Sequence, residues 1–157
     1  MKALVKAMPV LLPLAAQWAS QQERRILLSG VPLSEPHFSD AQLMGVMHPE
    51  KIRLLKVDRI PLPASKLLRS AAKLTGLVSP DTAGMSLRYG IFIRFDCWGD
   101  RRIIAHECVH TAQYERFGGF REFLKHYLRE CLEEGYPAGP LEQEAIQRSQ
   151  EIDRPKA

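Results

Sequence analysis

The residues whose types and spacing can do chemistry are His106, Glu107 and His110, which form the pattern HExxH. On a helix, residues four apart lie on one face with Cβ atoms ~5–6 Å apart, so both imidazoles can bind one metal ion. Glu107 lies one position further round, where it can contact a water molecule in an open coordination position. The spacing therefore predicts a zinc clamp with a general base beside it.

The chemistry expected of such a clamp is hydrolysis of a peptide or amide bond. A zinc ion lowers the pKa of its water to ~7 and stabilises the oxyanion that forms when the water attacks a carbonyl. Glu107 would accept the proton from the water and return it to the leaving amine. We expect this residue to be the catalytic base.

A catalytic zinc commonly has three protein ligands and a water, and two histidines with one glutamate form one such set. The segment 140–145, PLEQEA, offers Glu142 and Glu144 on a separate helix. We expect Glu144 to be the third ligand, with Glu142 as the alternative. Three glutamates nearer in sequence follow a helix whose apolar stripe would have to carry them inward: Glu130, Glu133 and Glu134.

A hydrogen-bond donor near the oxyanion would assist the reaction. Tyr136 is the first candidate because it lies in the loop before the helix of Glu142 and Glu144, and Tyr127 is the second. A structural role is the alternative for both, as it is for Tyr114 and His126. Cys108 is turned by roughly 200° from His106 on the helix, so we expect a packed core thiol and not a ligand.

The elements that position these residues are mostly helices, with strands in two segments. Apolar residues at helical spacing, together with Gly, Pro and Asp at the ends, predict helices over residues 14–28, 39–47, 63–76, 101–117, 120–134 and 141–152. Asp100 is the expected N-cap of the motif helix, which ends at Gly118. Residues 52–57 favour a strand, and residues 84–96 favour one strand or an antiparallel pair that turns near Tyr89-Gly90.

The fold class that follows is α+β, a mostly helical single domain spanning 1–157 with a small antiparallel sheet before the motif helix. Residues 1–80 form a helical N-terminal part, and residues 84–152 form the metal-binding core. The strand before the motif can present an edge to an extended peptide or can be ordinary core sheet.

Two segments carry a family resemblance: HECVHTAQ at 106–113 and PLEQEA at 140–145. Together they resemble the gluzincin zinc metallopeptidases, above all the minigluzincin-like domains and bacterial HExxH domains of unknown function. The resemblance implies a zincin-like fold over about residues 84–146. It also implies zinc bound by His106, His110 and Glu144, with Glu107 as the catalyst.

The chain departs from the larger gluzincins at one position. They place an Asp four residues after the ligand Glu to orient a motif histidine, and here that position is Arg148. The partner of the motif histidines is therefore unassigned, with Asp96, Asp100 and backbone carbonyls as candidates. This departure leaves an inactive zinc-stabilised binding or assembly domain as the alternative function.

Composition limits the remaining functions. A chain of 157 residues with a net charge of +4 has no concentrated basic block, so we expect no nucleic acid partner. The chemistry of the HExxH motif leads us to expect a peptide or protein substrate. The apolar run 7–16 contains two prolines and is shorter than the ~20 residues of a membrane span. The three cysteines of the chain have no paired spacing, so no disulfide framework or Cys-type zinc site is expected. A cytoplasmic location is predicted, with a secreted or periplasmic one as the alternative, and the oligomeric state is left open.

Overall fold

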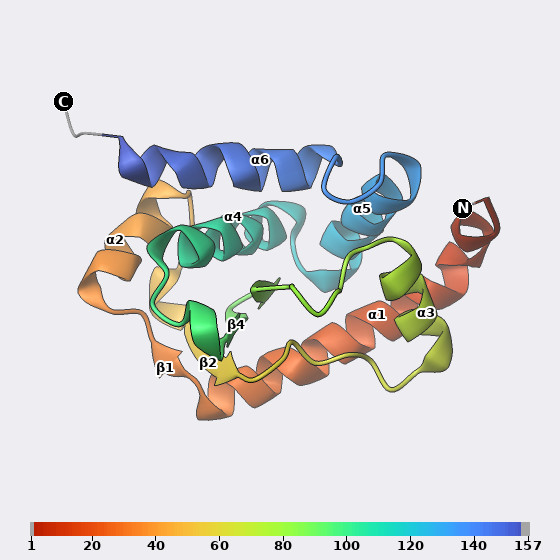
Figure 1. Cartoon of the computed structure of the whole chain (residues 1–157), viewed down its shortest axis with the longest axis horizontal. Helices are drawn as coiled ribbons and strands as arrows, with labels where there is room; N and C mark the ends of the chain where they lie inside the picture. Colours follow the sequence, from red (N-terminus) through yellow and green to blue (C-terminus); the bar gives the residue numbers. More distant parts are fainter. Residues whose placement is uncertain (1, 155–157) are drawn as a thin grey trace.

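A four-stranded sheet in the order β1-β2-β4-β3 lies inside the fold, in a computed structural model that describes residues 2–154 (Figure 1). β1 pairs antiparallel with β2, and β3 pairs antiparallel with β4. β2 and β4 are parallel. The bounds are β1 (Val31–Pro32), β2 (Arg53–Val57), β3 (Gly84–Leu87) and β4 (Gly90–Arg94).

The sheet is mixed, which corrects the expectation of an antiparallel sheet. The strand predicted at 52–57 is confirmed as β2, but it runs parallel to β4 and needs a long crossover connection. Helix α3 (Lys66–Leu74) lies in that connection. The N-terminal part is therefore not purely helical, because it contributes both β1 and β2. The turn expected near Tyr89-Gly90 is confirmed, and Arg88 adopts a φ of 65° there.

β4 is buried on both faces because the two sides of the sheet are covered by different helices. Ile91 and Ile93 point to one side, where they pack with Ile104 and Cys108 of α4 (Arg101–Phe117). Phe92 points to the other side and packs with residues of α1 (Lys2–Ser29). The near-continuous apolar sequence of β4 is thus a consequence of its position between two layers of helices.

Helix α1 confirms the prediction for 14–28 but begins twelve residues earlier, at Lys2, and includes Pro9 and Pro13. From Leu12 onwards its buried residues recur every three or four positions, and with Leu11 they form one face: Leu11, Leu12, Ala15, Ala19, Glu23 and Ile26. This face packs on the sheet, on α3 and on α5 (Phe120–Glu133). Figure 1 shows α1 as the long red-to-orange helix below the sheet.

By length and composition, α1 is the helix in the described part of the chain that could cross a membrane. Its most apolar 18-residue window has a mean hydropathy of 1.2, and 22% of that window is buried in the fold. A core helix and a signal sequence pass the same test, so this property does not assign α1 to a membrane.

Helices α2 (Glu35–Leu43) and α6 (Pro140–Ser149) lie with α4 on the other side of the sheet (Figure 1). The expected start of α2 at Ser39-Asp40 is wrong, because Ser34 occupies the N-cap position and Pro36 lies in the first turn. Asp40 lies inside the helix, buried, and accepts two hydrogen bonds from Arg101 at 2.7 and 2.8 Å. This ion pair ties α2 to the start of the motif helix.

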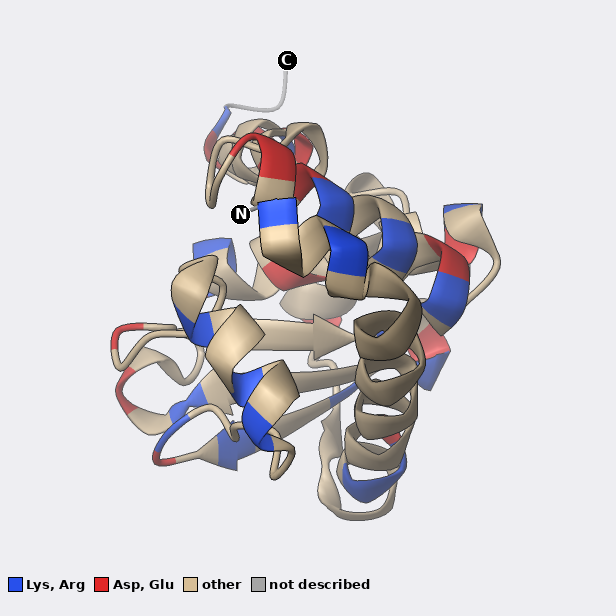
Figure 2. Ribbon diagram, turned by 90° about the vertical axis from the view of Figure 1, so that its right-hand side faces the viewer, with Lys and Arg blue, Asp and Glu red and all other residues tan. Residues whose placement is uncertain are grey.

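Charged residues are interspersed over the surface. On the side shown in Figure 2, Lys and Arg occur on several helices and loops, with Asp and Glu among them. This distribution agrees with the absence of a basic block in the sequence.

A buried ion pair joins α1 to the turn between β3 and β4. Glu23 is 2% exposed and accepts hydrogen bonds from Arg88 at 2.8 and 2.9 Å and from the backbone N–H of Tyr89 at 3.2 Å. The guanidinium also lies over the ring of Phe120. Glu23 thereby accepts the hydrogen bonds of the turn and stabilises the unfavourable backbone conformation of Arg88.

We predict that Glu23→Gln lowers the free energy of unfolding by ~2 kcal/mol, because charge-assisted hydrogen bonds contribute about that much and Arg88 is only partly shielded from water. Urea unfolding measures the change. The control Arg24→Gln, at an exposed position of the same helix, should change stability by less than ~0.5 kcal/mol. Equal effects of the two substitutions would contradict the prediction.

Candidate metal centre

Helix α4 carries the HExxH motif and is fixed at both ends as the sequence predicted. Asp100 caps its first turn by accepting a hydrogen bond from the N–H of Ile103 at 3.0 Å. Gly118 ends it with a φ of 83°, which glycine adopts at little cost. Between these ends, Cys108 is fully buried against the sheet, as expected of a core thiol, and burial raises its pKa.

The structure brings His106 and His110 together with Glu142 of α6. Nε2 of His106 lies 3.0 Å from Oε1 of Glu142, and Nε2 of His110 lies 3.1 Å from Oε2. The two Nε2 atoms are 3.2 Å apart. Ligand atoms bound at 2.0–2.1 Å to a tetrahedral metal are separated by roughly 3.3 Å. These three side chains therefore have the donor types and separations that fit a zinc ion.

Glu142 and not Glu144 is the carboxylate in this cluster, which corrects the predicted third ligand. Glu144 accepts hydrogen bonds from Arg116 at 2.8 and 3.0 Å and is not part of the cluster. Residues two apart on a helix differ by roughly 200° in direction, so the two glutamates cannot face the same point. Glu142 is 4% exposed, beside the buried residues Leu141 and Ala145.

A sequence signal for Glu142 exists. At ~100° per residue, Leu141, Ala145 and Ile146 form an apolar stripe centred close to Glu142 and far from Glu144. If the stripe consisted of Leu141 and Ala145 only, its centre would lie at the same angle from Glu142 as from Glu144. Ile146 therefore distinguishes the two positions.

Gln113 is the partner of His110 that the sequence reasoning missed. Its Oε1 lies 2.8 Å from Nδ1 of His110, while its Nε2 donates to the carbonyl of Leu141 at 2.9 Å and to Glu144 at 3.0 Å. Both acceptors fix the amide orientation, so Nδ1 of His110 must be the donor to Oε1. Nε2 of His110 is then left with a lone pair directed at the site.

The expected partners Asp96 and Asp100 serve other purposes. Asp96 pairs with Arg94, and Asp100 caps α4. The signal that could have found Gln113 is its spacing, because it lies three residues after His110 and shares a helix face with it. Glu144 thus retains a role at the site as the residue that orients Gln113.

The ligand cluster favours a positive charge among its atoms. Burial lowers the pKa of His110, but the hydrogen bond with Glu142 and the charge of Glu107 raise it by more. Burial also raises the pKa of Glu142, yet the hydrogen bonds with His106 and His110 hold it well below its ordinary value. Two acceptor atoms 3.1 Å apart repel unless a proton or a metal ion lies between them.

The predicted base, Glu107, is buried and points towards β3. Burial raises its pKa above the ordinary value, and the neighbouring His106 and His110 lower it in part. A methyl group on Gly84 would lie 2.9 Å from Oε1 of Glu107, so only glycine leaves room for this carboxylate.

The two tyrosines named as donors occupy different places. The hydroxyl of Tyr127 is buried and donates to Oε2 of Glu142 at 2.8 Å, so it holds a ligand in position. Tyr136 is 42% exposed, and burial with the charge of Glu142 raises the pKa of its phenol. The other two options lie apart from the ligands: His126 stacks on Phe117, and Tyr114 is packed in a core cluster.

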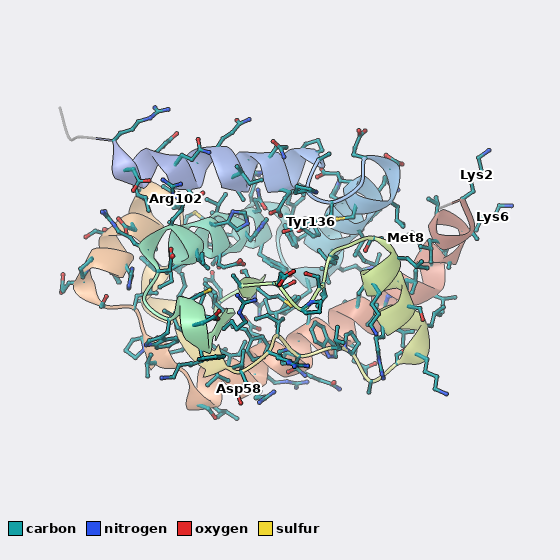
Figure 3. All side chains as sticks on the ribbon, viewed as in Figure 1. Lys2, Lys6, Met8, Asp58, Arg102 and Tyr136 are labelled. Carbon is teal, nitrogen blue, oxygen red and sulfur yellow. The ribbon has the colours of Figure 1, made fainter. Side chains whose placement is uncertain are left out.

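An open cleft of about 590 Å³ gives solvent access to the cluster. His106, Glu107, Glu142 and Tyr136 line it together with residues of the 79–84 segment. Figure 3 shows Tyr136 near the middle of the molecule in that view. A carbonyl compound entering the cleft can therefore meet the ligands, the buried carboxylate and a phenol together.

We predict that Glu142→Ala abolishes stoichiometric zinc binding, whereas Glu144→Ala retains one zinc per chain. The reason is that Glu142 supplies a ligand atom and Glu144 acts only through Gln113. Elemental analysis of chelator-free preparations measures the ratio. Loss of zinc in the Glu144 variant alone would restore the original assignment.

We also predict that Gln113→Leu weakens zinc binding by ~10- to 100-fold while the fold persists, because Nδ1 of His110 loses the group that orients it. Competition with a zinc-sensitive dye gives the affinity. Gln147→Leu makes the same change at an exposed position of α6 and should leave the affinity unchanged. An unchanged affinity in the Gln113 variant would remove the orienting role.

Comparisons of the chain with protein-family models, with curated proteins and with solved structures find no match.

Proposed function

We propose that this chain is a zinc-dependent metallopeptidase of the gluzincin type that hydrolyses peptide bonds. The observation that carries the proposal is the meeting of two imidazole nitrogens and the Glu142 carboxylate within 4.8 Å of one another, with the buried Glu107 beside them at an open cleft. Metal binding alone does not require Glu107.

Zinc is the metal that suits these ligands best. Two imidazoles and one carboxylate form a ligand set of catalytic zinc sites, and a group of three leaves a fourth position for water or substrate. Among residues 2–154 the cluster contains no further His, Cys, Asp or Glu ligand. When bound, the ion supplies an acidified water and polarises the substrate carbonyl.

The residues around the ligands divide the remaining tasks. Glu107 accepts a proton in its ionised form and passes it to the leaving amine, and its raised pKa makes it a stronger base than an exposed glutamate. Tyr136 carries its proton at neutral pH, as an ordinary phenol does, so it can donate a hydrogen bond to a developing oxyanion. Tyr127 and Gln113 hold Glu142 and His110 in place.

The sheet offers a binding surface for an extended peptide. β3 is an edge strand, since it pairs within the sheet with β4 alone. Gly84 at its start lines the cleft next to Glu107. We propose that the substrate backbone adds to this edge, which would bring its carbonyl groups along the cleft towards the ligands.

A zinc-stabilised binding domain without catalysis is the second candidate. The observation in its favour is the close support of the ligands by Tyr127 and Gln113, which a structural site would share. The open cleft and the buried Glu107 favour the enzyme. The cytoplasmic location and the peptide or protein substrate stay predictions.

We predict that Glu107→Gln binds one zinc per chain and lowers the rate of peptide hydrolysis at least ~100-fold, because the amide has no basic oxygen to accept the proton. Mass spectrometry of a diverse peptide pool, incubated with equal amounts of zinc-loaded protein, identifies and quantifies cleavage. The exposed Glu122→Gln on α5 is the matched control and should cleave like the wild type.

Full activity in the Glu107 variant would exclude it as the base. A wild type that binds zinc but cleaves no peptide in the pool would favour the binding domain.

A further inference from the structure

An apolar cavity of about 140 Å³ adjoins the candidate metal centre and shares His106, Glu107, Glu142 and Tyr136 with the lining of the open cleft. His110 also lines the cavity. The rest of its wall comes mainly from α1, α3 and α5, with Leu11, Ala15, Ala19, Leu68, Ala71 and Leu128 among the contributors.

The cavity is suited to an apolar occupant. Away from the metal centre its lining is almost entirely aliphatic and aromatic. A cavity of about 150 Å³ with such a lining stays dry and binds benzene, so this one has room for a group of that size. Without an occupant, the lining side chains lose contacts that a well-packed core would provide.

The lining residues on α1 and α3 include four alanines, which keep the space open. Ala15 and Ala19 are 7% and 1% exposed on the inner face of α1, and Ala71 and Ala72 line the cavity from α3. Larger residues at these positions would occupy the volume. The first eighty residues, which lie outside the HExxH resemblance, thus form much of the wall.

We propose that this cavity is a specificity pocket that takes one bulky apolar side chain of the substrate, such as that of Phe, Leu or Met, next to the bond that is cleaved. The identification of the occupant as a substrate side chain rests on the proposed function. The binding of an apolar group in the cavity does not depend on that function. Because His106, His110, Glu142 and Glu107 line the cavity, a side chain attached to a carbonyl bound among them can enter it.

The test compares two metal-binding probes on the zinc-loaded full chain: acetohydroxamate and 3-phenylpropanohydroxamate. Both carry the same chelating group, and only the second carries a phenyl ring. Burial of a ring should make it bind about tenfold more tightly or better. Calorimetric titration gives both affinities.

Ala15→Leu and Ala71→Leu fill the cavity from two different helices and should each remove the preference for the phenyl probe while acetohydroxamate binds as before. Ala16→Leu enlarges the neighbouring residue of α1, which does not line the cavity, and should keep the preference. Thermal unfolding confirms that each variant is folded. A preference that survives in both filled variants would overturn the proposal.

Benzene binding to the metal-free wild type, followed by methyl NMR shifts, separates the pocket from the metal chemistry. If benzene binds, the pocket is supported even when neither hydroxamate binds. The absence of hydroxamate binding would instead contradict the proposed zinc site. Equal affinities for the two hydroxamates, or no benzene binding, would overturn the pocket. Peptide cleavage with no preference for bulky apolar residues beside the cleaved bond would overturn it while the peptidase function stands.

Discussion

The structure of the site depends on one electrostatic constraint: three acceptor atoms from two helices point at a common centre. Nε2 of His106, Nε2 of His110 and the Glu142 carboxylate lie about 3 Å apart, a separation that needs a positive charge between them. Gln113 and Tyr127 hold this arrangement by bonding the outer sides of His110 and Glu142. Either a proton or a metal ion among these groups provides that charge.

The fold meets this constraint by using opposite faces of α4 for different purposes. One face packs against Ile91 and Ile93 of the buried strand β4, which fixes the rotation of the helix. The other face then has to present His106 and His110 to α6. Because Leu141 and Ala145 bury the inner side of α6, the position of Glu142 follows from core packing as much as from the site itself.

The N-terminal half completes the surroundings of Glu107. The long helix α1 covers the face of the sheet opposite α4, is tied to the β3-β4 turn by Glu23 and Arg88, and forms a wall of the apolar cavity with α3. Glu107 therefore lies between an open, partly polar cleft and an apolar cavity. The raised pKa of Glu107 is a result of that burial, to which residues of the first half contribute.

The sequence alone determined the features that depend on local spacing: the two histidines four apart, Glu107 beside them, the limits of α4 at Asp100 and Gly118, and the turn before Gly90. The tertiary structure alone decided that β2 runs parallel to β4 and that α1 and α3 enclose a cavity. It also decided between Glu142 and Glu144 and placed Gln113 against His110, where the sequence carried only weak signals. The physical reason is the distance along the chain over which each interaction acts. Helical spacing and caps act over a few residues, whereas strand direction and the rotation of α6 depend on which distant apolar side chains share a core.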